Sequence, residues 1–170
     1  MNPIMSSRHS VSFLLLVVGA AAFVLLTSLS LPVVVASHFD AAGTANGFMP
    51  RAFYVRFMLA FNVVLPLVVV YLPNLALCNP RARINLPHRE YWLAPDRRAE
   101  TVAYLCAHSF RMGSGLVIFL AYVHWLVVRA NGQFPPGLSS SWFLGGLGVF
   151  VACAIIWLAL LFARFRTIPR

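Results

Sequence analysis

Four long apolar segments constrain the fold of this chain more than any other feature. They cover approximately residues 11–35, 52–78, 101–128 and 142–165, and each is long enough for a helix to cross the hydrocarbon core of a bilayer. Because only helices and closed barrels satisfy their backbone polar groups in lipid, we expect transmembrane helices. The connections between them are short. The sequence therefore predicts an all-α integral membrane bundle that forms a single domain over residues 1–170.

The composition agrees with a lipid environment and argues against a soluble protein. Of the 170 residues, 61% are hydrophobic and only 10% are charged, which is too apolar for a water-soluble domain. All 13 basic residues are arginines, and the net charge is +9. These arginines mostly flank the apolar segments and form no continuous basic face. We therefore expect contact with the lipid bilayer and no binding of nucleic acid.

The arginines are distributed unevenly between the two sides of the predicted bundle. On one side are Arg8, Arg81, Arg83, Arg89, Arg97, Arg98, Arg164, Arg166 and Arg170, and on the other are Arg51 and Arg129. Because basic residues near helix ends favour the cytoplasm, we expect the richer side, with both termini, to be cytoplasmic (N-in/C-in). The first apolar segment is too long for the hydrophobic region of a signal peptide, so we expect it to remain as a helix.

The segment between the first two predicted helices contains a distinctive pattern. Leu31-Pro32 is followed by His38-Phe39-Asp40, then by Gly43, and finally by Asn46-Gly47 and Arg51. This pattern resembles the bacterial domain of unknown function 1648, which also forms the N-terminal part of SdpI-like immunity membrane proteins. The resemblance covers about the first two helices. It implies a small multi-pass protein of the bacterial inner membrane and, in its SdpI-like branch, a role in toxin immunity coupled to sensing.

The same segment is the first candidate binding site. Its candidate residues are His38, Phe39, Asp40, Gly43, Gly47 and Arg51. Glycine permits a sharp turn, so we expect a positive φ at Gly43, and Asp40 could orient the His38 ring through a charge-assisted hydrogen bond. The alternative interpretation is a capped turn at the membrane surface that binds nothing. One histidine beside one carboxylate does not predict a metal site.

A second candidate lies within the third predicted helix. At 3.6 residues per turn, a polar stripe of Glu100, Tyr104, His108 and Arg111 shares one face. An arginine facing the middle of a bilayer is costly, so we expect Arg111 to point into the bundle. Snorkelling of Arg111 toward the headgroups is the alternative. His124 lies off this stripe, and we expect it near the membrane interface.

These features leave more than one function open. The sequence contains no recognisable catalytic motif, so we expect a protein that is not an enzyme and needs no cofactor or metal. The leading hypothesis is SdpI-like sensing or immunity through the His38 turn. One alternative is an accessory subunit that packs on a membrane-protein partner or on a second copy of the chain. The other is a small transporter or proton-handling protein that uses the polar stripe.

Overall fold

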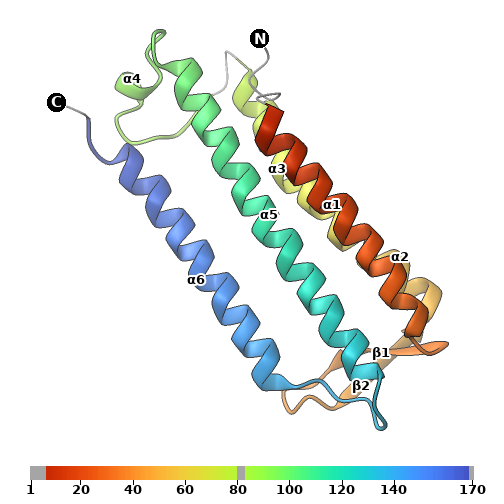
Figure 1. Cartoon of the computed structure of the whole chain (residues 1–170). Helices are drawn as coiled ribbons and strands as arrows, with labels where there is room; N and C mark the ends of the chain where they lie inside the picture. Colours follow the sequence, from red (N-terminus) through yellow and green to blue (C-terminus); the bar gives the residue numbers. More distant parts are fainter. Residues whose placement is uncertain (1–6, 80–82, 169–170) are drawn as a thin grey trace.

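The computed structural model describes residues 7–79 and 83–168 and shows a mostly helical protein (Figure 1). The helical elements are α1 (Ser7–Thr27), the 3-10 turn η2 (Ser28–Ser30), α2 (Arg51–Leu59), the π-helical segment η3 (Ala60–Val64), α3 (Leu65–Cys78), α4 (Arg89–Trp92), α5 (Arg98–Asn131) and α6 (Ser140–Phe165). The strands are β1 (Val34–Phe39) and β2 (Ala45–Pro50).

The prediction of four spans is confirmed. Four helical stretches are long and apolar enough to cross a membrane, namely Arg8–Ser30, Arg51–Cys78, Arg98–Asn131 and Ser140–Phe165. The first stretch begins and the last one ends at the same end of the molecule, as an even number of spans requires (Figure 1). Arg81 and Arg170, which contribute to the arginine count, lie outside the described residues.

The first span is shorter than predicted, and the segment that follows it is not a simple turn. The apolar run continues to residue 35, but helix α1 ends at Thr27 and the 3-10 turn ends at Ser30. Pro32 follows, and a proline cannot donate the backbone hydrogen bond that a continuing helix needs. Residues 34–39 then pair with residues 45–50 in an antiparallel hairpin. The all-α prediction therefore missed a two-stranded sheet.

Helix α5 is the central element of the bundle. Helices α1 and α3 pack against one of its faces, whereas α6 lies along another and makes no comparable contact with α1 or α3 (Figure 1). One buried cluster joins α1, α3 and α5 through Phe13, Val17, Ala20, Val70, Phe110 and Val117. A second lies under the hairpin and includes Val24, Leu31, Val35, Tyr54, Met58 and Val127. Within α6 only Phe165 is buried, so most of this helix is open to lipid.

The second span contains a π-helical turn, η3, between α2 and α3. Pro66 follows this turn and has no N–H to donate to the carbonyl of Asn62, four residues earlier. The widened turn accommodates this missing bond. The Nδ2 group of the buried Asn62 side chain donates to the Met58 carbonyl at 3.0 Å. This hydrogen bond lies within the same span and does not link it to another helix.

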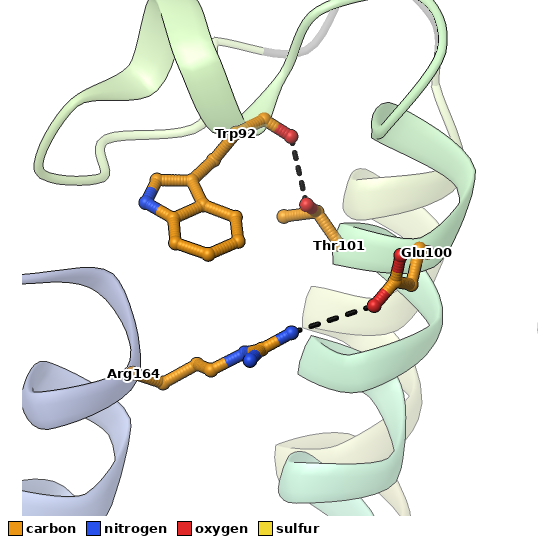
Figure 2. A network of polar contacts seen from close by, with 4 residues as sticks. All are labelled: Trp92, Glu100, Thr101 and Arg164. Carbon is orange, nitrogen blue, oxygen red and sulfur yellow. Dashed lines mark hydrogen bonds and ion pairs between the residues drawn. The ribbon is translucent and has the colours of Figure 1, made fainter. Parts of the chain in front are cut away.

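The end opposite the hairpin is closed by α4 (Figure 2). The Thr101 hydroxyl donates to the Trp92 carbonyl at 2.7 Å, and the buried Trp92 ring meets the Phe165 ring at 5.3 Å. The Arg164 guanidinium lies 5.2 Å from the centre of the Trp92 ring and 3.4 Å from Glu100 Oε1 (Figure 2). These contacts hold the connection between α3 and α5 against the C-terminal end of α6.

The packing of α5 predicts that an alanine is tolerated at one of two nearby glycines and destabilises the protein at the other. A Cβ on Gly113 would lie 2.2 Å from Val70 Cγ2 and 3.1 Å from a ring carbon of Phe13, whereas a Cβ on Gly115 would meet nothing within 4 Å. We expect Gly113→Ala to lower the free energy of unfolding by about 1–3 kcal/mol through overpacking. Gly115→Ala is the matched control and should leave stability unchanged or slightly higher. Unfolding of both variants in detergent checks this, and equal stabilities would contradict the packing.

Candidate functional site at the hairpin end

The hairpin tip is a tight turn built by Asp40 and Gly43. One Asp40 carboxylate oxygen accepts the backbone N–H groups of Ala42 and Thr44, each at 2.9 Å. Gly43 adopts φ +86°, which confirms the expected positive φ, and a Cβ there would lie 2.0 Å from the Leu138 carbonyl oxygen. Asp40 therefore caps the turn, and Gly43 permits both the turn and the close approach of the chain before α6.

The other predicted residues of this segment have separate roles. The exposed His38 ring lies within hydrogen-bonding distance of the Asn46 side chain through Nδ1, rather than of Asp40. Gly47 lies opposite His38, where a Cβ would approach the His38 Cβ to 2.8 Å. Arg51 closes the base of the hairpin, because its backbone N–H donates to Val33 O and its guanidinium to Leu31 O, both at 2.9 Å.

The hairpin tip is fastened to the connection between α5 and α6. The Leu138 N–H donates to the Gly43 carbonyl at 2.8 Å, and the Ser140 hydroxyl donates to the Ala41 carbonyl at 3.1 Å. Thr44 and Gly137 form an isolated antiparallel bridge beside them. The tip is therefore a fixed part of the bundle end.

Two hollows flank this fastening, one on each side. The first has a volume of about 410 Å³, and the hairpin contributes Ser37, His38, Phe39, Asp40 and Ala41 to its wall. The second has a volume of about 590 Å³ and contacts Gly43, Phe48, Arg129 and Trp142. His38, Phe39 and Asp40 thus come together in one hollow and Gly43 contacts the other. Gly47 and Arg51 line neither of the two.

Asn131 clamps the hairpin to the last turn of α5. Its Oδ1 accepts the Ala36 N–H at 2.9 Å, and its Nδ2 donates to the Ala36 carbonyl at 2.9 Å. The side-chain amide thus satisfies both backbone groups of one residue of β1, as a further strand would. Asn131 was not among the residues predicted for this site. The sequence feature that could have indicated this role is its position two helical turns after His124, which places its amide side chain on the same face of the helix.

His124 was expected at the interface, but the structure buries it completely between α1, α2 and α5. Its Nε2 lies 2.8 Å from Thr27 Oγ1, and its Nδ1 lies 2.9 Å from the Tyr54 hydroxyl. The Thr27 hydroxyl donates to the Phe23 carbonyl at 2.6 Å, so it accepts from His124 Nε2–H. His124 Nδ1 then accepts from Tyr54 O–H. Both ring nitrogens of a neutral His124 are therefore hydrogen-bonded within the helical bundle.

The polar stripe of α5 is only partly internal. His108 is buried and shares reciprocal hydrogen bonds with α6, since its Nε2 lies 3.0 Å from Trp157 O and Trp157 Nε1 donates to His108 O at 2.9 Å. Tyr104 stacks on His108 with ring centroids 5.5 Å apart, and Glu100 pairs with Arg164. The stripe therefore packs α6 against α5.

The expectation that Arg111 points into the bundle is wrong. Arg111 is exposed, and no hydrogen bond or ion pair reaches it from the part of the chain that the structure describes. It follows Phe110, whose ring contacts Phe13 at 5.6 Å. Because Phe13 is five residues after Arg8, Arg111 lies about 9 Å further along the helix axis than Arg8. The long arginine side chain can extend toward the headgroups at the Arg8 end, so the structure favours snorkelling. Arg111 is therefore not part of an internal polar stripe.

No metal centre emerges among residues 7–79 and 83–168, where histidines, cysteines and carboxylates do not gather in groups of three. Cys106 is buried and Cys153 is exposed, and Cys78 lies at the end of α3.

The buried hydrogen-bond chain predicts a specific loss in Tyr54→Phe. This change leaves His124 Nδ1 buried without a donor, and we expect a loss of about 1–3 kcal/mol in the free energy of unfolding. Tyr104→Phe is the matched control, because no hydrogen bond to the Tyr104 hydroxyl comes from the described residues. Thermal unfolding in detergent measures both, and an undiminished midpoint for Tyr54→Phe would contradict the chain.

Comparison with known proteins identifies one family model that matches part of the chain. No curated protein and no solved structure matches the chain. Residues 14–64 match the family model described as Domain of unknown function (DUF1648). The match begins in α1, includes the whole hairpin and ends with η3, so it contains every residue of the candidate turn. Residues 14–64 thus form a DUF1648-like segment of a multi-pass membrane protein.

Proposed function

We propose that the protein is a non-enzymatic protein of the bacterial inner membrane that recognises a membrane-active peptide at its hairpin end, in an SdpI-like immunity or sensing role. The observation that carries this proposal is the hollow of about 410 Å³ that contains His38, Phe39 and Asp40. The arginine distribution supports an orientation in which this hollow faces the periplasm.

The chemistry of the hollow suits an amphipathic ligand. Its wall is mostly apolar, with Val123, Leu126, Val127, Phe143 and Leu144 supplied by α5 and α6. The polar groups are concentrated on the hairpin side. Within the described chain, His38 Nε2 and the second oxygen of Asp40 make no hydrogen bond. An apolar wall with a few convergent polar groups is typical of ligand sites, and these two groups can bind amide or ammonium groups of a peptide.

A challenge assay tests this proposal. Cells that express the protein are exposed to a panel of secreted membrane-lytic peptides, and survival is compared with that of cells lacking it. We expect protection against at least one peptide, and we expect His38→Ala to abolish it because the exposed ring contributes to binding rather than to folding. His9→Ala, an exposed histidine near the start of α1, is the control and should retain protection.

Two results would overturn the proposal. One is unchanged survival with every peptide, and the other is full protection by His38→Ala at normal membrane levels. An impermeant thiol reagent checks the orientation in the same cells, after Cys78, Cys106 and Cys153 have been replaced. A cysteine at Thr44 should react from outside, whereas one at Asp96 in the opposite connection should not.

A second candidate function is that of an accessory subunit. It is favoured by α6, which packs along its length mainly on α5 and carries Gly145 and Gly148 with nothing within 4 Å of an added Cβ. Such positions allow another helix to approach closely in a bilayer. Co-purification of a stoichiometric membrane partner in gentle detergent would favour this role, and a chain that purifies alone would favour peptide recognition.

A further inference from the structure

We propose that the second hollow at the hairpin end is a binding site for the headgroup of an anionic phospholipid, with Arg129 as its cation. The hollow has a volume of about 590 Å³, and its walls come from the hairpin tip, the end of α5 and the start of α6. It is separated from the His38 hollow by the fastening between Gly43 and Leu138. The inference is therefore independent of peptide recognition.

The charge of the hollow is determined by Arg129. No other charged residue lines the hollow, and the remaining polar side chains in its wall are Thr44, Gln133 and Ser139. No hydrogen bond or ion pair from the described residues reaches the Arg129 guanidinium. The acids Glu90, Asp96 and Glu100 belong to the opposite end, and Asp40 caps the hairpin turn. The chain thus leaves an unpaired cation facing a concave surface.

Two indole rings hold this cation in place. The guanidinium carbon of Arg129 lies 5.5 Å from the centre of the Trp125 ring and 5.4 Å from that of the Trp142 ring. Cation–π contacts of this kind restrict the conformations of the arginine side chain. They do not use its N–H groups as hydrogen-bond donors, so these groups can still donate to a ligand. A planar guanidinium with free donors matches the oxygens of a phosphate group.

The start of α6 adds positive potential at the same place. Ser139 precedes α6, and its hydroxyl lies 3.1 Å from the Ser141 hydroxyl and does not cap a backbone N–H of the helix. The partial positive charge at the helix N-terminus is therefore not compensated by a side-chain oxygen. Both Ser139 and Trp142 line the hollow, so the helix start and Arg129 act on the same ligand.

The position and lining favour a lipid over a free anion. Trp125 and Trp142 are interfacial in type and place Arg129 at headgroup depth. Phe48, Leu126 and Pro136 provide apolar contacts for the glycerol and upper acyl region. No acid in the hollow can pair with an ammonium group, so a headgroup whose only charge is the phosphate, such as that of phosphatidylglycerol, fits better than a zwitterionic one.

Native mass spectrometry of the full chain with added lipid tests this assignment. We expect the protein to retain phosphatidylglycerol in preference to phosphatidylcholine. Arg129→Gln should weaken phosphatidylglycerol binding about tenfold, which corresponds to the loss of one charge-assisted hydrogen bond. Arg56→Gln is the matched control, because Arg56 is exposed on α2, donates to the Ala52 carbonyl and does not line the hollow. It should bind lipid as the unchanged protein does.

Three outcomes would overturn the proposal. They are equal retention of the two lipids, equal loss in the Arg129→Gln and Arg56→Gln variants, and displacement of the lipid by inorganic phosphate at millimolar concentration. The last outcome would indicate a site for free anions. The thermal midpoint of each variant shows whether it is folded, and if Arg129→Gln fails to fold, Arg129→Lys replaces it. The point charge of lysine should retain the preference for phosphatidylglycerol with weaker binding.

Discussion

The side-chain amide of Asn131 and the imidazole of His124 connect α5 to the hairpin and the first two spans, and the arrangement of the hairpin end depends on them. A polar group buried in a membrane protein is costly unless the protein supplies its partner. Asn131 satisfies both backbone groups of Ala36, and His124 accepts from Tyr54 while donating to Thr27. Since both anchors lie on one face of α5, they fix the position of the hairpin relative to that helix.

This dependence means that the DUF1648 segment is completed by another part of the chain. Thr27, Ala36 and Tyr54 all lie within residues 14–64, whereas His124 and Asn131 lie outside them. The hairpin tip is likewise fastened to Leu138 and Ser140. Both hollows are therefore shared between the family segment and the later helices. The proposed recognition at this end of the molecule would therefore require α5 and the start of α6.

The sequence predicted the spans because a run of apolar residues is a sufficient signal for a helix in lipid. It misplaced the end of the first span, since the valines at 33–35 continue the apolar run although Pro32 prevents the helix from continuing. The positive φ of Gly43 was predictable from local chemistry. The burial of His124 and the exposure of Arg111 were not, because α5 packs on two different faces and periodicity within one helix does not reveal which neighbours cover each face.

Amide hydrogen exchange at Ala36, measured by NMR in detergent, tests the central role of α5 most directly. In the unchanged protein the Ala36 N–H should be strongly protected by Asn131 Oδ1. In Asn131→Leu its exchange should accelerate about tenfold or more, as expected for the loss of one to two buried hydrogen bonds, while the amides of α1 keep their protection. Asn85→Leu, in the opposite connection, should change nothing. Equal protection of Ala36 with and without Asn131 would contradict the account.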